Sequence, residues 1–303
     1  MIRYSLNPGD LVGVIAPSSS VRRINSDIQA GINYLKKAGF RVKTGQHWQE
    51  KFYYSAGQVE HRLKDLETMF ADPTVKAIIC ATGGSSANQL LSKIDYSLIK
   101  KNPKIFLGFS DITVLLLAFW AKSGLPTFHG PTVYELAKLT DSSRRQLFDL
   151  LSGRITRCDF PKEMKVLRQG RARGKFLGGN ITLINSLLGT SFFPTLVGKI
   201  LFWEDVGLSP ADIDFKLNEL KLSGAFSRIT GMVIGHLSHC VDKKYPEDNR
   251  PIRDIALEVT AGSKFPIFQV DYFGHDINNF YTFPEGGTAT LDTASKIFSV
   301  SVK

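Results

Sequence analysis

The sequence predicts a two-domain α/β protein, and three features of the chain lead to that fold class. Apolar strand-like runs alternate with amphipathic helical segments over residues 1–140, which is typical of βαβ units and a mostly parallel, flavodoxin-like sheet. A polar and basic stretch follows over residues 141–173, with little periodicity beyond a short helix expected around residues 146–151, and we interpret this stretch as a linker. A second alternating block over residues 174–303 ends in short segments that predict a mixed, partly antiparallel and barrel-like sheet.

The N-terminal block contains strand and helix signals in regular alternation. Continuous apolar runs predict buried strands over residues 12–16, 40–42, 75–81 and 105–107. Apolar residues at helical spacing predict helices over residues 26–37, 59–70 and 87–92, and a buried helix after residue 110. Gly39 and Asp72-Pro73 stop the first two helices. Residues 46–57 are rich in aromatic and polar groups and are predicted to form a long loop.

The C-terminal block repeats this alternation and begins with a strand, a double-glycine turn and a helix. Strands are predicted over residues 175–177, 199–203, 229–235 and 267–270. Helices are predicted from the turn at Gly178-Gly179-Asn180 to about residue 188, and over residues 212–223 and 252–260. Residues 281–302 alternate and are expected to form short antiparallel strands that close this domain.

Composition is that of an ordinary soluble globular protein and favours neither a membrane protein nor a nucleic-acid-binding protein. The chain has 303 residues, 43% of them hydrophobic, and a formal net charge of +10. Its strongest apolar run, residues 114–121, is too short to span a bilayer. The densest basic stretch, residues 168–175, contains no aromatic side chain, so a solvated connector is favoured over a nucleic-acid surface.

Targeting and cysteine usage favour the cytoplasm. The N-terminus has no apolar signal-peptide core. Cys80, Cys158 and Cys240 are far apart and in no metal-ligand spacing, which is typical of a reducing compartment and argues against a structural zinc. The chain has no dinucleotide fingerprint, phosphate loop or HExxH pattern, so no cofactor and no metal are expected.

A candidate nucleophile stands at the turn between the fourth strand and the buried helix, in the sequence KIFLGFSDITVLLLAFWAK. The turn places Ser110 at the carboxyl end of a strand and at the positive end of a helix, where backbone N–H groups can stabilise an oxyanion. A serine at a helix start can also be only a cap. In a parallel sheet the Gly83-Gly84 turn lies on the same edge, where ligands bind.

A serine nucleophile needs a histidine base and an orienting carboxylate. By position in the chain, the candidate bases are His129, His236 and His275, each of which follows an expected strand or helix. The candidate carboxylates are Glu204 and Asp205, which are adjacent at the end of a strand. Since side chains alternate across a strand, only one of these two carboxylates can face a given site.

Taken together in order, these short motifs resemble the LD-carboxypeptidase family of serine hydrolases, which also includes the hydrolases that give immunity to the peptide-nucleotide antibiotic microcin C. The motifs run along nearly the whole chain: Gly9-Asp10 with Val14-Ile15-Ala16-Pro17-Ser18, Gly83-Gly84 with Leu90-Leu91 and Ile94-Asp95-Tyr96, Gly108-Phe109-Ser110-Asp111-Ile112-Thr113, His129-Gly130-Pro131, Gly178-Gly179-Asn180, Glu204-Asp205 with Ile213-Asp214 ahead of Leu217 and Leu220, and Gly274-His275.

The resemblance implies a role for particular residues. It implies a triad of Ser110, Glu204 and His275, with the backbone N–H groups of Gly84 and Asp111 as the oxyanion hole. Residues that we expect to contact substrate are Gly83, Ser85 and Asn180. The resemblance also implies a homodimer that releases the terminal D-alanine of a murein tetrapeptide in cell-wall recycling.

Two alternatives stay open at this point. Many LD-carboxypeptidases have an arginine before the double glycine, whereas Thr82 stands there in this chain and residues 85–88 differ as well. This turn is closer to the microcin-immunity branch, whose substrates are peptidyl or aminoacyl nucleotides. A non-catalytic α/β ligand-binding protein is the other alternative, and it requires Glu204 and His275 to lie far from Ser110. His129 is expected to pack rather than to react.

Overall fold

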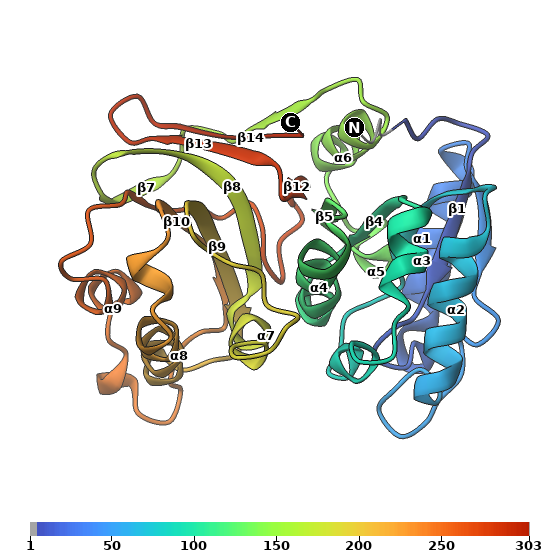
Figure 1. Cartoon of the computed structure of the whole chain (residues 1–303), viewed down its shortest axis with the longest axis horizontal. Helices are drawn as coiled ribbons and strands as arrows, with labels where there is room; N and C mark the ends of the chain where they lie inside the picture. The colour runs from blue at the N-terminus through green and yellow to red at the C-terminus, as the bar shows by residue number, and fades with distance from the viewer. Residues whose placement is uncertain (1–4, 303) are drawn as a thin grey trace.

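The computed structural model describes residues 5–302 and contains two α/β units side by side, each built on its own sheet (Figure 1). The strands of the first sheet follow the order β12-β5-β4-β3-β1-β2. Their bounds are β1 Leu11–Ile15, β2 Arg41–Thr44, β3 Val75–Cys80, β4 Ile105–Gly108, β5 Thr127–His129 and β12 Phe283–Glu285. Strands β1 to β5 are parallel in the order 2-1-3-4-5, which is the flavodoxin-like order. The predicted fold class is therefore confirmed.

Helices connect these strands. Their bounds are α1 Asn25–Lys37, α2 Val59–Ala71, α3 Tyr96–Lys101, α4 Thr113–Ser123, α5 Val133–Leu136 and α6 Asp141–Leu151. Helix α4 is buried from Thr113 to Phe119 because it lies between the two units (Figure 1). Helix α3 was not predicted, since it has only six residues; its start is fixed by Asp95, which accepts hydrogen bonds from the N–H groups of Ser97 and Leu98.

The second sheet has eight strands in the order β6-β14-β13-β8-β9-β10-β11-β7. Their bounds are β6 Arg157–Asp159, β7 Lys165–Arg168, β8 Arg171–Asn180, β9 Lys199–Val206, β10 Gly231–Ser238, β11 Ile267–Gln269, β13 Thr288–Asp292 and β14 Ile297–Ser301. Strands β8 to β11 are parallel and the remaining pairs are antiparallel, so the sheet is mixed as predicted.

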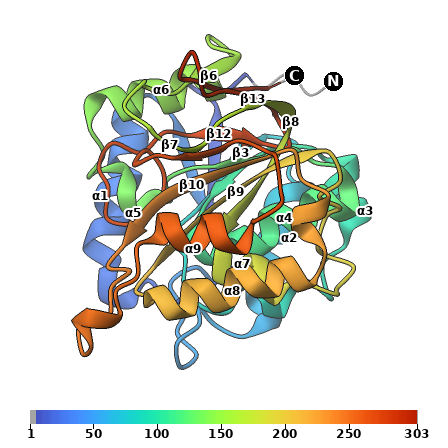
Figure 2. The same ribbon diagram turned by 90° about the vertical axis from the view of Figure 1, so that its left-hand side faces the viewer.

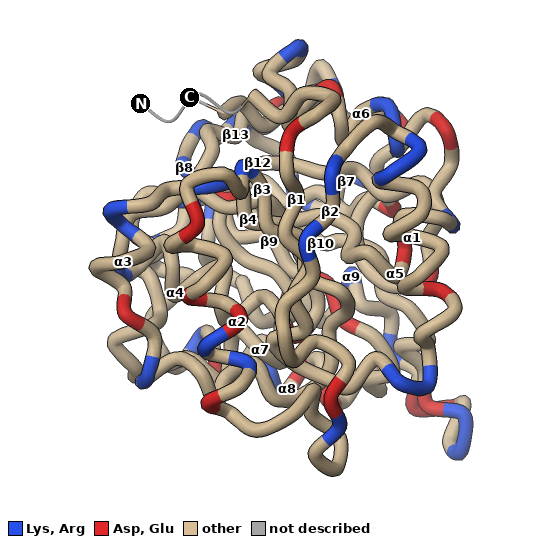
Figure 3. Tube along the Cα trace, turned by 90° about the vertical axis from the view of Figure 1, so that its right-hand side faces the viewer, with Lys and Arg blue, Asp and Glu red and all other residues tan. Residues whose placement is uncertain are grey.

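Three helices lie side by side on one side of the second sheet (Figure 2). They are α7 Ile181–Ser186, α8 Pro210–Leu222 and α9 Ile252–Val259. Within residues 5–302 no helix combines the length and the hydropathy needed to cross a bilayer. On the face that Figure 3 presents, basic and acidic residues are interspersed rather than gathered by sign.

Several expected loops are regular structure. Residues 141–173, expected to be a linker, contain α6 and the strands β6 and β7 of the second sheet. Residues 168–175, expected to be a solvated connector, form the end of β7 and the start of β8. The turn expected at Gly178-Gly179 is the end of β8, and a Cβ at Gly178 would lie 1.7 Å from the carbonyl oxygen of Phe202. Residues 127–129, expected to belong to a turn, form β5. These strands are short or glycine-rich, so periodicity could not reveal them.

The chain end joins the two units. Strand β12 was expected to close the C-terminal domain, but it pairs antiparallel with β5 of the first sheet. Each of the two apolar cores contains residues from both units; Phe106 and Leu201 lie in one core, and Phe128 and Phe202 in the other. The units are therefore packed against each other over a continuous apolar interface.

Glu285, the last residue of β12, places a carboxyl group inside this interface. It is fully buried, and it accepts hydrogen bonds from the Gly178 N–H at 3.1 Å and the Thr127 hydroxyl at 3.5 Å. Burial raises the pKa of Glu285 to about 8, although these two hydrogen bonds oppose the shift. The carboxyl is therefore mostly neutral in the folded protein at pH 7, whereas it is ionised in the unfolded chain.

We expect the contribution of Glu285 to the free energy of unfolding to fall as the pH rises from about 4.5 to about 8. In this range the native state binds more protons than the unfolded state at Glu285, so the contribution is at most about 1.4 kcal/mol per pH unit. Denaturant unfolding at several pH values measures it, and Glu285→Gln should flatten the dependence. Glu247→Gln, at an exposed position, should follow the wild type. Parallel curves for the wild type and Glu285→Gln would contradict the assignment.

Candidate active site

The turn after β4 holds Ser110 in an uncommon backbone conformation. Phe109 is extended, with φ −156° and ψ −169°, and Ser110 has φ +61°. A 3₁₀ turn, Ser110–Ile112, then leads into α4. A non-glycine residue in the left-handed region costs roughly 1 to 3 kcal/mol, and this sharp strand-to-helix turn is the geometry of a nucleophile elbow. The turn exposes the Ser110 hydroxyl at the edge of the sheet.

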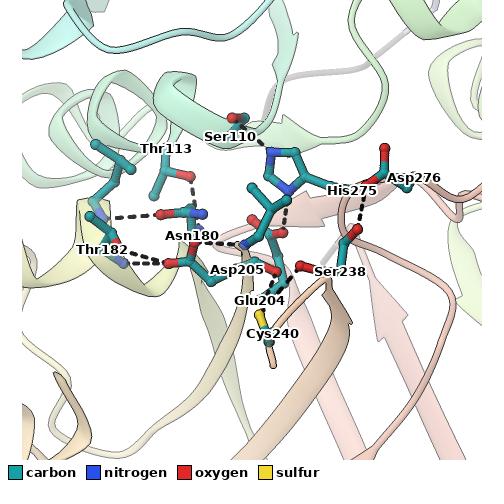
Figure 4. A network of polar contacts seen from close by, with 12 residues as sticks. Ser110, Thr113, Asn180, Thr182, Glu204, Asp205, Ser238, Cys240, His275 and Asp276 are labelled. Atoms are coloured by element: carbon teal, nitrogen blue, oxygen red, sulfur yellow. Dashed lines mark hydrogen bonds and ion pairs between the residues drawn. The ribbon is translucent and has the colours of Figure 1, made fainter. Parts of the chain in front are cut away.

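Ser110, His275 and Glu204 form one hydrogen-bonded chain (Figure 4). His275 Nε2 lies 2.9 Å from Ser110 Oγ, and His275 Nδ1 lies 2.7 Å from Glu204 Oε2. The three residues come from the turn after β4, the segment after β11 and strand β9. Because a carboxylate only accepts hydrogen bonds, Nδ1 carries the proton and Nε2 is free to accept the serine proton. The structure thus brings together the three residues that the resemblance implied.

Two opposing effects set the charge state of His275. Its burial lowers its pKa, but the adjacent Glu204 carboxylate, with smaller contributions from Asp205 and Glu135, raises it more, so the pKa of His275 is raised overall. Glu204 is fully buried. The close packing of the segment before His275 requires glycine at position 274. Gly274 has φ +130°, and a Cβ there would lie 2.7 Å from the His236 carbonyl oxygen.

The neighbouring carboxylate, Asp205, has a different task. Its Oδ2 accepts hydrogen bonds from the N–H and the hydroxyl of Thr182, at 3.0 and 2.7 Å. Thr182 lies in the first turn of α7, so Asp205 stabilises the start of that helix. The alternation along β9 therefore points Glu204 at the imidazole and Asp205 at α7, as the strand geometry predicted.

The other two candidate histidines do not lie in this chain of hydrogen bonds. His129 is fully buried, its ring packs against Phe202 and Phe283, and burial lowers its pKa to about 3. Neither ring nitrogen of His129 has a hydrogen-bond partner within residues 5–302, so this side chain packs, as expected. His236 is partly exposed and contacts Asp271 at 3.1 Å.

The double-glycine turn after β3 lies beside the Ser110 hydroxyl. A Cβ at Gly83 would lie 2.9 Å from Ser110 Oγ, and Gly84 has φ +145°. Within the described part of the chain, the Gly84 N–H has no hydrogen-bond acceptor, and Gly84 and Ser85 are exposed. The Gly84 N–H is therefore a backbone donor without an acceptor, in a turn whose neighbouring residue, Gly83, adjoins the serine.

Asn180 is placed close to the triad but is engaged in local structure. It is paired with Glu204 in the β8–β9 register, and its side-chain oxygen accepts a hydrogen bond from the Leu183 N–H at 3.2 Å. Its own N–H donates to the Thr113 hydroxyl at 3.1 Å. Asn180 thus caps α7 and ties β8 to the start of α4. Its role in substrate binding stays a prediction.

Sequence reasoning missed a buried polar network beneath the serine turn. The Asp111 carboxylate, considered only for its backbone N–H, accepts hydrogen bonds from Ser18, Ser86 and Ala87. Arg62 from α2 donates to the carbonyl oxygens of Pro17 and Ser86, both at 2.9 Å. The sequence indicated only that the turns after the parallel strands share one edge of the sheet. It did not show which groups of these turns donate hydrogen bonds to Asp111.

A cavity of about 320 Å³ adjoins the triad. It is lined by residues of α5 and of the segment after β11, including Phe109, Tyr134, Lys138, Gly274 and His275. Phe109 and His275 contact each other, with ring centroids 5.0 Å apart. Of the three triad residues, only His275 lines this cavity.

Two residues of the predicted loop over residues 46–57, His47 and Glu50, form with His61 of α2 the one cluster in the described chain that offers three metal-binding side chains. His47 Nδ1 and His61 Nδ1 lie 2.8 and 2.7 Å from the two carboxylate oxygens of Glu50. The two imidazole rings stack, with ring centroids 4.2 Å apart and an interplanar angle of 20°. Through Glu50 these contacts join the loop to α2.

Together, the two sheets and the Ser-His-Glu chain define a two-domain α/β serine hydrolase. The chain belongs to the LD-carboxypeptidase family: residues 12–130 match its N-terminal domain and residues 173–291 its C-terminal domain. It is 36% identical to a probable murein peptide carboxypeptidase of Bacillus subtilis, over 96% of this chain and 92% of that protein.

Two further comparisons concern the immunity branch of the family. The chain is 27% identical to the microcin C7 self-immunity protein MccF of Escherichia coli, over 99% of this chain and 96% of that protein. The crystal structure of an MccF-like protein from Bacillus anthracis superimposes with a TM-score of 0.90 at 29% identity, covering 100% of this chain and 99% of the other.

The positive φ of Ser110 makes a prediction about stability. Ser110→Gly should be more stable than Ser110→Ala by about 1 kcal/mol, because only glycine adopts this backbone conformation without strain. Thermal or denaturant unfolding of the two variants measures the difference. The same pair of changes at Ser186, in helix α7, should give the opposite order. Equal stability of the two Ser110 variants would contradict the strained turn.

Proposed function

We propose that this enzyme is a serine LD-carboxypeptidase that releases the terminal D-alanine from a murein tetrapeptide. The observation that carries the proposal is the chain of hydrogen bonds from Ser110 through His275 to the buried Glu204. A murein peptide carboxypeptidase activity is also named for the Bacillus subtilis relative. This relative is more similar in sequence to this chain than the immunity protein MccF is, with 36% against 27% identity.

In the proposed catalytic cycle Ser110 is the nucleophile, His275 acts first as a base and then as an acid, and Glu204 orients His275. His275 Nε2 takes the proton from Ser110 Oγ as the serine attacks the carbonyl carbon of the scissile amide. Glu204 fixes the imidazole through Nδ1 and stabilises its charged form. His275 then gives the proton to the leaving amine, and a water molecule activated by the same imidazole hydrolyses the acyl-enzyme.

The tetrahedral intermediate places negative charge on the former carbonyl oxygen. We assign the Gly84 and Asp111 N–H groups as its donors, because both turns adjoin the serine and the Gly84 N–H has no acceptor within residues 5–302. One such donor is worth on the order of 10² to 10³ in kcat. We propose that Ser85, exposed in the same turn, contacts the acyl part of the substrate.

An immunity-type amidase with the same triad is the second candidate. The three tryptophans offer little for stacking on a nucleobase: Trp203 is fully buried, Trp48 is nearly so, and Trp120 packs against Gly286. The loop next to the double-glycine turn, however, exposes the rings of Phe52, Tyr53 and Tyr54. Ser55 of this loop bonds to Ser86 at 2.9 Å, so the loop that carries the three aromatic residues is joined to the segment directly after the double-glycine turn.

The proposal includes two further properties. We propose that the enzyme works in the cytoplasm, which its three free and buried cysteines favour, and that it forms a homodimer, which the family resemblance implies. The non-catalytic alternative is disfavoured, since it required His275 and Glu204 to lie far from Ser110, and the observed separations are those of hydrogen bonds.

Assays on two substrates test the proposed function. We expect purified enzyme to release D-alanine from murein tetrapeptide, and Ser110→Ala to abolish this turnover while the protein remains folded. An aminoacyl sulfamoyl adenylate is the competing substrate. Faster cleavage of the adenylate would favour the immunity-type amidase, and near-normal tetrapeptide turnover by Ser110→Ala would exclude this serine as the nucleophile.

The raised pKa of His275 predicts the acid limb of the pH profile. The base must be neutral to accept the serine proton, so kcat/KM should fall as the pH decreases through a midpoint above the usual histidine value of about 6.5. Glu204→Gln removes the main group that raises this pKa, so its midpoint should move to lower pH and kcat should drop by roughly 10⁴-fold.

Asp205→Asn is the matched control, because Asp205 adjoins Glu204 but bonds to Thr182 instead of to His275. Its midpoint should shift less than that of Glu204→Gln. Equal shifts of the midpoint in the two variants, measured on folded protein, would show that Glu204 is not the orienting carboxylate.

A further inference from the structure

The buried carboxylate directly after the proposed nucleophile is not used in the catalytic cycle described above. Asp111 is only 2% exposed, and its Oδ2 accepts three hydrogen bonds. The donors are the Ser18 hydroxyl at 2.5 Å and the N–H groups of Ser86 and Ala87, each at 2.8 Å. Ser18 follows β1, whereas Ser86 and Ala87 follow β3, so one oxygen atom joins three separate turns of the carboxyl edge.

The double-glycine turn needs such support. Gly83 and Gly84 have no side chains, and Gly84 has φ +145°, a conformation that glycine alone adopts readily. Space also requires both glycines, since a Cβ at Gly84 would lie 2.5 Å from Ser18 Oγ and one at Gly83 would lie 2.9 Å from Ser110 Oγ. The residues that bring the Gly84 N–H close to the serine therefore cannot hold it there themselves.

The supporting bonds lie immediately after the glycines. Ser86 and Ala87 are bound to Asp111, and Asp111 belongs to the same 3₁₀ turn as Ser110. The position of the turn is thus fixed relative to the nucleophile rather than only to the sheet. On the other side, the Arg62 guanidinium holds the Ser86 carbonyl oxygen and Pro17, which keeps the turn from moving away from Ser18.

From this geometry we infer that the Asp111 side chain is a positioning group that aligns the Gly84 N–H with the developing oxyanion. The inference rests on the proposed function, because it takes Ser110 as the nucleophile. Oxyanion donors act only when they are held about 2.7 to 3.1 Å from the oxygen of the intermediate. A displacement of about 1 Å can cost on the order of 10² in rate. The Asp111 carboxylate touches no substrate and acts through the turn.

Ser18→Ala gives the sharpest test, since it removes one of the three donors and leaves every proposed catalytic group in place. We expect kcat on murein tetrapeptide to fall by about 10- to 100-fold, with KM changed by less than about twofold, because the oxyanion exists only in the transition state. The acid midpoint of the pH profile should not move, since His275 and Glu204 are unchanged. Asp111→Asn should lower kcat further.

Ser20→Ala is the matched control. Ser20 lies two residues from Ser18 in the same segment, but its hydroxyl bonds to the Glu50 carbonyl oxygen at 3.1 Å instead of to Asp111. It should keep the wild-type kcat. Equal losses in the two serine variants, a change in KM instead of kcat, or a loss that matches the fraction of unfolded protein would overturn the inference.

A fluorophosphonate separates this inference from the proposed substrate. The reagent phosphonylates an activated serine and develops charge on the phosphoryl oxygen, so its rate depends on the same donors and requires no murein peptide. If the wild type reacts at Ser110 but does not cleave tetrapeptide, the proposed substrate is wrong, and a slower reaction of Ser18→Ala than of Ser20→Ala still supports the inference. Absence of any reaction at Ser110 would overturn both.

Discussion

The chemistry of this protein depends on holding Ser110 in one unit within hydrogen-bond distance of His275 in the other. An Nε2–Oγ separation of 2.9 Å leaves little tolerance for relative movement of the units. Three features provide the required rigidity. The chain end returns to the first sheet as β12, both apolar cores contain residues of both units, and α4 lies between the sheets (Figure 1). The interface is therefore part of the candidate active site.

Four acidic side chains are buried around this interface, and each is compensated differently. Glu204 contacts the imidazole of His275, Asp205 accepts bonds at the start of α7, and Asp111 accepts three donors from two turns. Glu285 has weaker compensation, and burial raises its pKa to about 8. Burying a charge is costly unless it is paired or hydrogen-bonded, and the few partners of Glu285 do not offset the cost of burying its charged form.

At the carboxyl edge of the first sheet, a residue with a strained backbone lies next to glycines that pack closely against their neighbours. Ser110 has a positive φ, and the Gly83-Gly84 turn packs against both Ser110 and the Ser18-Ser19 segment. Strained residues persist only where surrounding contacts fix them. Here the Asp111 network supplies those contacts, and the loop with Phe52, Tyr53 and Tyr54 extends the same edge toward solvent. The part of the chain that differs from many family members is therefore next to the nucleophile.

The sequence by itself determined the α/β class, most helices and the parallel strands. A parallel strand that is buried on both faces of the sheet requires a continuous apolar run, such as residues 75–81. Strands β5, β6 and β7 and helix α3 are too short to leave a periodic signal. Residue patterns placed Ser110 at a corner but left three histidines and two carboxylates open, and only family resemblance chose among them. The tertiary structure decided the rest, since which imidazole meets Ser110, and where the Asp111 carboxylate finds its donors, depends on contacts between segments 24 to 165 residues apart.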